Sequence, residues 1–461
     1  MIQRTLAQIA EMIIVDNNFT EFAQTAVTGV CIDSRKIAPG NLFVPFKGEN
    51  ADGHKYVEAA IKQGAAAAFW QSDVPNPPLH LPLLMVDNTL TALQELARSY
   101  RQELPVKVVG ITGSNGKTTT KDITANLLSL KYKVQKTEGN FNNEIGLPLT
   151  VLGLDEDTDI AVLEMGMSSR GEIEFLTKLA RPSAVIITNI GESHLLDLGS
   201  RDGITEAKLE IISGLEQGGL IVYFGDEPLL KNRLTEYHGN GLIKTFGKAE
   251  TNDLYPTNIS QSDLGNLFTV TGREEKFSLP VLGAHNVLNA LAAMLVAHYF
   301  KVPFSEMNAG FANLKLTQMR TELVGGGNGE KIINDAYNAS PTSMNAAVEL
   351  ISNLEGYQKK ILVLGDMLEL GPQEEEFHFQ IGQSLNSQKI DLLFTFGRLG
   401  RKIAEGAQTV LPKERIFSFD DKNSLIERLK SQTNDRTLVL VKASRGMRLE
   451  EVVTGLQVAK S

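Results

Sequence analysis

The sequence predicts an α/β protein of three domains: a small mixed α/β N-terminal domain, a central parallel-sheet domain with a phosphate-binding loop (P-loop), and a C-terminal Rossmann-like α/β domain. Two observations carry this prediction. Short apolar runs alternate with helix-length segments through the middle and last thirds, as in parallel sheets joined by crossover helices. At 461 residues, the chain is also too long for a single hydrophobic core, and its length predicts two or three domains. We expect the domains to cover residues 1–85, 86–314 and 315–461.

The first 85 residues are predicted to form the smallest domain. Apolar residues at helical spacing open it and predict an amphipathic helix rather than a secretory signal. These residues are Leu6, Ile9, Ala10 and Ile13. A proline-rich stretch at 74–78 and a short apolar run at 83–86 end the domain, and a helix is expected next, at 91–100.

The central domain is predicted from four apolar runs that lie a helix-length apart, at 106–111, 160–163, 184–187 and 220–223. Polar groups follow three of these runs. Because ligands of open α/β sheets bind beyond the carboxyl ends of the strands, we expect these groups to converge. The longest apolar helical stretch, 289–300, is too short to span a membrane and is predicted to be a core helix.

The last third repeats the alternation of the central domain. Apolar runs at 361–364, 392–396 and 438–441 are separated by helical patterns and predict a second α/β domain. This domain has no phosphate loop of its own. A glycine cluster at 325–329 is expected to form a turn near its start.

The composition is that of a globular protein. Apolar residues make up 42% of the chain and charged residues 22%, with a formal net charge of −10 at pH 7. This charge disfavours nucleic acid or an anionic membrane as a partner. The single cysteine excludes an internal disulfide and a multi-cysteine metal site. We therefore expect a cytoplasmic enzyme that neither binds nucleic acid nor inserts into a membrane.

The most informative segment is the loop at 110–121, which reads Gly-Ile-Thr-Gly-Ser-Asn-Gly-Lys-Thr-Thr-Thr-Lys between a strand and a helix. Its glycines let backbone N–H groups approach phosphate oxygens, and the helix N-terminus favours negative charge. In the general P-loop pattern, Lys117 contacts the terminal phosphates and Thr118 offers a hydroxyl to Mg²⁺. Ile111 stands where that pattern has glycine. We predict a nucleoside triphosphate site; the alternative is a glycine-rich turn.

Other polar residues are ambiguous on sequence grounds. Glu164, at the end of an apolar run, suits either Mg²⁺ or a salt bridge. A single histidine such as His194 is more often structural, and Lys208, in an acidic helical segment, is expected to be solvated. Asn286 and Asn289 share one helix face, where they could recognise a base edge or cap the helix.

Weaker candidates lie in the two outer domains. Arg320 could contact phosphate, and Asp335 could bind a ribose hydroxyl or Mg²⁺. Ser34, Arg35 and Lys47 lie in predicted loops of the N-terminal domain. These loops suit a phosphate or nucleotide-sugar pocket, and equally an ordinary turn.

Taken in order along the chain, these motifs resemble those of the ATP-dependent Mur ligases of peptidoglycan synthesis. The resemblance covers essentially the whole chain. It rests on 112–119, 164–166, His194, Lys208, His285 and Asn286 with Asn289, Arg320 and Asp335. In that family a non-glycine residue before Thr112 is normal, so Ile111 agrees with the resemblance. The resemblance implies a central P-loop ATPase domain and an ATP-dependent acid–amino-acid ligase that forms ADP and phosphate.

Three segments are most similar to the family members that add D-Ala-D-Ala to UDP-N-acetylmuramoyl-tripeptide: 335–341, 365–371 and 444–450. In that reaction the γ-phosphate of ATP passes to the tripeptide carboxylate. The amine of the dipeptide then attacks the acyl phosphate and forms an amide, which gives the UDP-muramoyl-pentapeptide for cell wall synthesis. This sequence has serine at position 340, where the pattern of these family members is expected to have asparagine.

The resemblance also implies roles for the residues of the site. Lys117 and two Mg²⁺ ions would neutralise the transferring phosphoryl group. Thr118 and Glu164 would hold one Mg²⁺, and His194 would help to hold the second. Lys208 matches a family lysine that CO₂ carbamylates, and a carbamate could bind Mg²⁺ whereas a protonated lysine cannot.

Further residues are assigned through the same resemblance. The ATP site would comprise Gly113, Ser114, Asn115, Gly116, Lys117, Thr118, Thr119, Asn286, Asn289, Arg320 and Asp335. The substrates would contact Ser34, Arg35, Lys47, Asn140, Asn142, Asn143, Ser168, Arg170, Tyr337, Asn338 and Arg445, with the last three near the incoming dipeptide. A monomer is expected, with domains that close on the substrates.

Two alternatives compete with this interpretation. Another ligase of the superfamily, one that adds the third amino acid or a folylpolyglutamate synthetase, would prefer L-lysine, meso-diaminopimelate or glutamate as the acceptor. A regulatory P-loop ATPase would hydrolyse ATP without either substrate. The sequence has no Asn-Lys-x-Asp motif, which disfavours a GTPase. The third residue of the tripeptide, L-lysine or meso-diaminopimelate, stays open.

Overall fold

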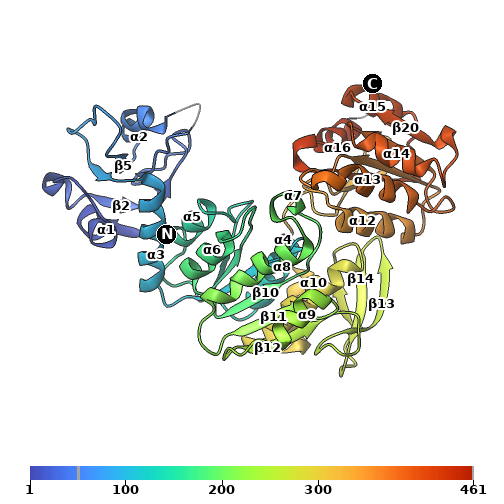
Figure 1. Cartoon of the computed structure of the whole chain (residues 1–461), viewed down its shortest axis with the longest axis horizontal. Coiled ribbons are helices and arrows are strands. Elements are labelled where there is room, and N and C mark those ends of the chain that lie inside the picture. The colour runs from blue at the N-terminus through green and yellow to red at the C-terminus, as the bar shows by residue number, and fades with distance from the viewer. Residues whose placement is uncertain (49–51, 459–461) are drawn as a thin grey trace.

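The computed structural model describes residues 1–48 and 52–458, which form three α/β units in chain order (Figure 1). The N-terminal unit has a four-stranded parallel sheet, β3-β4-β5-β6, and a short antiparallel pair, β1-β2. Its elements are β1 (Gln3–Thr5), α1 (Leu6–Met12), β2 (Ala26–Thr28), β3 (Val30–Cys31), β4 (Leu42–Phe43), α2 (Val57–Lys62), β5 (Ala67–Gln71) and β6 (Leu83–Val86). The predicted opening helix is confirmed: Leu6 and Ile9 are buried, and Thr5 caps α1.

The central unit is built on a six-stranded parallel sheet in the order β12-β11-β10-β7-β9-β8. Its strands are β7 (Lys107–Thr112), β8 (Val134–Lys136), β9 (Ile160–Glu164), β10 (Ala184–Ile187), β11 (Leu220–Phe224) and β12 (Leu242–Phe246). Its helices are α3 (Thr89–Glu103), α4 (Lys117–Leu128), α5 (Gly146–Leu152), α6 (Glu172–Ala180), α7 (Leu195–Leu198), α8 (Arg201–Leu209), α9 (Pro228–Thr235), α10 (His285–Tyr299) and α11 (Met307–Ala312). Because helices cover both faces, neighbouring strand residues such as Val108 and Val109 enter different cores.

A three-stranded antiparallel sheet of the central unit was not predicted. It consists of β13 (Pro256–Ser262), β14 (Gly265–Val270) and β15 (Phe277–Leu279). No residue of β13 is fully buried, so this strand has no apolar run that could have revealed it. In Figure 1 the sheet lies beside α10, at the side of the central unit nearer the C-terminal unit.

The C-terminal unit is a second six-stranded sheet, ordered β16-β17-β21-β18-β19-β20, in which only the edge strand β16 is antiparallel. Its elements are β16 (Glu322–Gly325), β17 (Lys331–Asn334), α12 (Pro341–Asn353), β18 (Lys359–Gly365), α13 (Glu374–Gln383), β19 (Leu392–Phe396), α14 (Gly400–Ala407), β20 (Ile416–Phe419), α15 (Lys422–Lys430), β21 (Thr437–Lys442) and α16 (Glu450–Gln457). The predicted glycine turn joins β16 to β17, where Gly326 N–H donates to the carbonyl of Glu330.

The N-terminal and central units share one hydrophobic core through α3. Leu93, Leu96 and Tyr100 of this helix are fully buried, and their cluster reaches from Leu6 in α1 to Leu163 in β9. The C-terminal unit has its own core on each face of its sheet, and the only buried central residue in either is Leu282, among the residues described. The first two units are therefore joined by a shared apolar core, whereas the third unit is joined to them mainly by contacts outside its apolar cores.

The predicted α/β architecture of three domains is confirmed, and every short apolar run named above overlaps a strand. The apolar stretch at 289–300 lies in α10 up to Tyr299, where the helix ends, and the buried residues of this helix pack in the central core. No helix in the described ranges is long and apolar enough to cross a membrane. The boundaries at residues 85 and 314 stay a prediction.

The shared core predicts the effect of truncating α3. Leu96→Ala should lower the free energy of unfolding by about 2–5 kcal/mol, because Leu96 is 0% exposed and its removal leaves a cavity. Gln102→Ala, on the exposed side of the same helix, should change it by less than about 0.5 kcal/mol. Urea unfolding followed by far-UV circular dichroism measures both variants. Equal midpoints for the two would contradict the shared core.

Candidate functional site

A cleft of about 820 Å³ lies between the central and C-terminal units. Its central wall contains residues 114–117 of the P-loop, the segments after β9 and β10, and the start of α10. Its C-terminal wall contains residues around 335–346 and the end of β21. The polar groups that follow β7, β9 and β10 do converge here, as predicted from their positions at strand ends.

Two glycines fix the shape of the P-loop. Gly113 has φ +148°, and a Cβ atom there would lie 1.8 Å from the hydroxyl of Thr188. Gly116 has φ +81°, and a Cβ atom there would lie 2.5 Å from Oδ1 of Asn289. No side chain of the described residues caps α4, so its first backbone N–H groups are available to an anion. The loop therefore has the backbone of a phosphate site.

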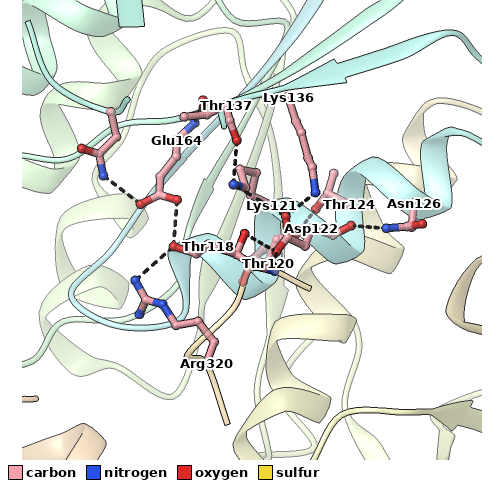
Figure 2. A network of polar contacts seen from close by, with 12 residues as sticks. Thr118, Thr120, Lys121, Asp122, Thr124, Asn126, Lys136, Thr137, Glu164 and Arg320 are labelled. Atoms are coloured by element: carbon pink, nitrogen blue, oxygen red, sulfur yellow. Dashed lines mark hydrogen bonds and ion pairs between the residues drawn. The ribbon is translucent and has the colours of Figure 1, made fainter. Parts of the chain in front are cut away.

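Lys117 and Thr118 open α4 beside a buried carboxylate. The hydroxyl of Thr118 donates to Oε2 of Glu164 at 2.9 Å (Figure 2). The amide of Asn142 donates to Oε1 of Glu164 at 2.9 Å. Lys117 Nζ donates to the carbonyl of Gly113 at 2.8 Å, and burial lowers the pKa of its ammonium group. The hydroxyl and carboxylate oxygens are the kind of ligand that Mg²⁺ prefers.

These few oxygen ligands fit Mg²⁺ only together with ligands from a bound molecule. Within residues 1–48 and 52–458, no group of three or more His, Cys, Asp or Glu is arranged to hold a metal by itself. Mg²⁺ in phosphate-transfer sites typically takes one or two protein oxygens and completes its shell with phosphate and water. Thr118 and Glu164 are a donor set of that type.

Arg320, in the segment just before β16, brings a cation to the P-loop helix. Its Nη2 donates to the Thr118 hydroxyl at 3.3 Å, and its guanidinium lies over the Tyr337 ring at 4.1 Å. Its Nε is buried and has no hydrogen-bond partner among the described residues. A buried N–H donor without a partner is costly, so this guanidinium is suited to an added anion such as phosphate.

Asp335 is less free to bind a ligand than Arg320. Its Oδ2 pairs with Nζ of Lys442 at 2.6 Å, and its Oδ1 accepts from the backbone N–H of Thr321 at 3.1 Å. Lys442 Nζ also donates to the carbonyl of Asn338 at 2.9 Å. Asp335 and Lys442 therefore form the base of the C-terminal wall, at the ends of two neighbouring strands.

The expectation of a solvated Lys208 is wrong. Lys208 is 1% exposed, because it faces the core side of α8 while the acids beside it face elsewhere. Glu206 pairs with Arg233, and Glu210 accepts from backbone N–H groups near the start of α6. Burial and then the positive charge of Lys117 lower the pKa of Lys208 well below its ordinary value.

His194 lies in the same region of the cleft. Burial, followed by the charges of Lys117 and Lys208, lowers the pKa of His194 to about 4, so its imidazole is neutral at pH 7 and can be a metal ligand. Its Nδ1 lies 3.1 Å from Oε2 of Glu369 in the C-terminal unit. The two atoms lack hydrogen-bond geometry and the imidazole is neutral at pH 7, so this is a contact and not an ion pair.

Asn286 and Asn289 lie on one face of α10, as predicted. Asn286 Nδ2 donates to the carbonyl of Leu282, and Asn289 Nδ2 donates to Oδ1 of Asn286 at 2.8 Å. Both side chains are buried and both line the cleft. These contacts orient the two amides at the P-loop, since Asn289 also lies against Gly116.

Ser340 contacts the P-loop across the cleft. It caps α12 by accepting from the backbone N–H of Ser343, and its hydroxyl donates to Oδ1 of Asn115 at 3.1 Å. Glu192 and Thr342 form a second such contact at 2.7 Å. A serine at 340 therefore serves both as a helix cap and as a link between the units, which gives its departure from the family pattern a structural role.

The structure brings most of the predicted site residues to this cleft. Those that line it are Ser114, Asn115, Gly116, Lys117, Thr118, Thr119, Asn142, Asn143, Glu164, Ser168, His194, Lys208, Asn286, Asn289, Arg320, Asp335, Tyr337 and Asn338. Those that do not line it are Gly113, Ser34, Arg35, Lys47, Asn140, Arg170 and Arg445. In the N-terminal unit, Arg35 pairs with Asp33 and Lys47 with Asp73, and both basic side chains are exposed.

Sequence reasoning missed several residues of the cleft, of which Lys442 is the most telling. Lys442 ends an apolar run, and its partner Asp335 is 107 positions away. Asn189 Oδ1 accepts from the backbone N–H of Asn115 at 2.9 Å and so supports the P-loop. Asn189 was expected in the cleft because it follows the apolar run at 184–187, and the same strand-end rule applies to Lys442.

Comparison with known proteins identifies relatives over the whole chain. The sequence matches "Mur ligase family, catalytic domain" over residues 26–101, "Mur ligase middle domain" over 111–297 and "Mur ligase, glutamate ligase domain" over 319–445. A curated relative from Bacillus subtilis (strain 168), UDP-N-acetylmuramoyl-tripeptide–D-alanyl-D-alanine ligase, is 52% identical over 99% of each chain.

Solved structures agree with these matches. MurF from Acinetobacter baumannii has a TM-score of 0.88 at 27% identity, and the match covers 99% of each chain. MurF ligase from Thermotoga maritima in complex with ADP has a TM-score of 0.81 at 30% identity, covering 94% of this chain and 97% of that one.

The packing of the P-loop predicts the effect of a single methyl group. Gly116→Ala should weaken the binding of Mg²⁺ with a non-hydrolysable ATP analogue by about tenfold or more, because the left-handed backbone and Asn289 both oppose a Cβ atom. Gly272→Ala is the control, since Gly272 also has positive φ (+69°) but has open space around it. Calorimetric titration that gives equal affinities for both variants would contradict this account of the loop.

Proposed function

The chain belongs to the Mur ligase family, and we propose that it is the member that adds D-Ala-D-Ala to UDP-N-acetylmuramoyl-tripeptide with the energy of ATP. The product is the UDP-muramoyl-pentapeptide of peptidoglycan synthesis. The full-length similarity to the Bacillus subtilis ligase supports this substrate pair. The observation that carries the chemistry is the P-loop lysine beside the Thr118–Glu164 pair, with Arg320 contacting Thr118 from the segment before β16.

The residues of the cleft can position both steps of this reaction. The P-loop backbone, Lys117 and Arg320 would hold the phosphates of ATP in line with the tripeptide carboxylate, so that phosphoryl transfer needs little reorganisation. Their charges offset the repulsion between two anions as the acyl phosphate forms. The amine of the dipeptide then attacks the acyl carbon, an amide bond forms and phosphate leaves.

We infer two Mg²⁺ sites in this cleft. Thr118 and Glu164 would hold one ion, and His194 would help to hold the other. Bound Mg²⁺ supplies charge neutralisation at the phosphate oxygens. The neutral imidazole of His194 leaves its lone pair available for this purpose.

Carbamylated Lys208 is the proposed partner of His194. Lys208 is buried beside another lysine, and no carboxylate among the described residues pairs with it. A carbamate would convert this cation into an anion with two oxygen ligands. That change would relieve the repulsion between Lys117 and Lys208 and supply a metal ligand that the cleft otherwise lacks.

The outer units would bind the two substrates. We infer that 1–85 holds the UDP end through Ser34, Arg35 and Lys47, and that 86–314 holds ATP and, through Asn140, Asn142, Asn143, Ser168 and Arg170, the peptide. Residues 315–461 would complete the ATP site and bind the dipeptide near Tyr337, Asn338 and Arg445. All of these residues belong to one chain, so a monomer would suffice for the reaction. The enzyme would need ATP, which suits a cytoplasmic location.

The proposed function predicts a double substrate requirement. Phosphate release from ATP should need both a UDP-muramoyl-tripeptide and D-Ala-D-Ala, measured with the L-lysine and the meso-diaminopimelate forms of the tripeptide. Free L-lysine, meso-diaminopimelate and glutamate should not replace the dipeptide. Hydrolysis that ignores both substrates would indicate a regulatory ATPase, and preference for a single amino acid would indicate another ligase of the superfamily.

The carbamate predicts the behaviour of Lys208 variants. Lys208→Ala should reduce ligase activity by about 10²–10³-fold, and short-chain carboxylic acids should restore part of it by supplying the missing anion. Lys208→Arg keeps the positive charge and should be neither active nor rescued. Incubation with ¹³C-labelled CO₂ should give the wild-type protein a carbamate NMR signal that Lys208→Ala lacks. Wild-type activity in Lys208→Ala would refute the role.

A further inference from the structure

A buried carboxylate joins the P-loop helix to the segment between the central and C-terminal units. Asp122, one turn after Thr118 on α4, is 1% exposed. Its Oδ1 pairs with Nζ of Lys136 at 2.6 Å and lies 3.6 Å from Nζ of Lys121 (Figure 2). Its Oδ2 accepts from both the backbone N–H and the hydroxyl of Thr317, at 2.8 and 2.9 Å. We call residues 313–321, between α11 and β16, the interdomain linker.

The contact with Asp122 lies only three positions before the arginine of the site. From Thr317 the chain runs to Arg320, whose Nη2 returns to the Thr118 hydroxyl at 3.3 Å. Thr118 and Asp122 are four residues apart on α4 and therefore lie on one face of the helix. The segment from Thr317 to Arg320 is thus fixed to the same helix face at both of its ends.

The backbone around Arg320 is in a conformation that needs outside support. Met319 and Thr321, on either side of it, have φ +59° and +53°, and such values are rare for a β-branched residue. Conformations of this kind persist where the surrounding contacts hold them. Here Asp335 accepts from the backbone N–H of Thr321, and Asp122 holds Thr317. One carboxylate from each unit therefore fixes the linker.

The lysines around Asp122 connect it to Glu164 at the end of β9. Lys121 Nζ donates to the carbonyl of Thr137 at 2.7 Å, and the hydroxyl of Thr137 accepts from the backbone N–H of Glu164 at 3.0 Å. Lys121 is fully buried. Burial of several charged side chains costs free energy unless each charge is paired. Apolar side chains of similar volume would stabilise the fold at least as well, so stability alone does not explain these charges. A positional role gives a reason for the charges.

We propose that Asp122 is a positioning residue for the nucleotide site: it holds Thr317 against α4 and thereby sets where Arg320 presents its guanidinium beside Thr118. This contact keeps the C-terminal unit and the P-loop in a fixed relative position around the nucleotide phosphates. The inference rests on the proposed function in one respect, namely that Arg320 contacts a nucleotide phosphate.

The test measures the affinity for Mg²⁺ with a non-hydrolysable ATP analogue, together with kcat, both KM values and the urea midpoint. Asp122→Asn keeps the shape. The ammonium groups of Lys136 and Lys121 favour the amide oxygen at the Oδ1 position, so the nitrogen takes the place of Oδ2 and cannot accept from the backbone N–H of Thr317. The substitution should weaken analogue binding by about tenfold. The KM for ATP should rise in proportion, while the KM for D-Ala-D-Ala stays unchanged. Thr317→Val removes one of the two donors and should shift binding in the same direction by less.

A double-mutant cycle separates positioning from stabilisation. In an Arg320→Ala background, Asp122→Asn should weaken analogue binding no further, because the group that it positions is gone. Asn126→Ala is the matched control: it lies on α4 and donates to the backbone carbonyl of Asp122, yet it has no hydrogen bond to the linker. Its analogue affinity should stay within about twofold of wild type.

Two results would overturn the proposal. One is an additive loss of affinity in the Arg320→Ala background, and the other is a lowered urea midpoint in Asp122→Asn with wild-type analogue affinity. If Asp122→Asn does not fold, Thr317→Val alone and with Arg320→Ala decides by the same criteria. A wild-type protein that binds no nucleotide would refute the proposed function instead, whereas an active ligase with additive effects would refute this inference alone.

Discussion

Burial of Glu164 at the carboxyl end of β9 imposes the main constraint on the site, because a carboxylate removed from water must be matched by donors or cations. Thr118 from α4 and Asn142 from the loop after β8 each donate to one of its oxygens. These contacts fix the start of α4 and the 138–145 loop relative to the sheet. Lys117 begins the same helix and Arg320 contacts the same Thr118 hydroxyl, so both take their positions from this arrangement.

The three units are held together in two different ways. The N-terminal and central units share a continuous apolar core, which makes them one body in energetic terms. The C-terminal unit meets the central one through hydrogen bonds and charged side chains, such as Ser340 with Asn115 and Thr342 with Glu192. The residues that would handle ATP lie at that second boundary. A ligase with substrates that enter and products that leave needs one boundary that can open, and the polar one is suited to it.

The sequence predicted the elements whose signal is local. The apolar runs of the parallel sheets, the opening helix and the P-loop each lie within a short window, and the strand-end rule placed Glu164 and His194 in one cleft. The sequence could not show which side chains pair when the two residues are far apart in the chain. Lys208 looked solvated because its acidic neighbours are adjacent in the chain, yet they point to Arg233 and to the start of α6. Lys442 and Asp122 have partners about a hundred or more positions away, and β13 lacks an apolar run.

The contrast between the two boundaries also has a thermal consequence. Exposure of apolar surface is what gives a conformational change a large heat-capacity increment, and hence a strong dependence on temperature. Among the described residues, Leu282 is the only buried apolar side chain of the central unit that enters a C-terminal core, so separating these units uncovers little such surface. The equilibrium between joined and separated central and C-terminal units should therefore vary only weakly with temperature. The free energy of unfolding of the combined N-terminal and central units should keep the curved temperature dependence of an ordinary folded domain.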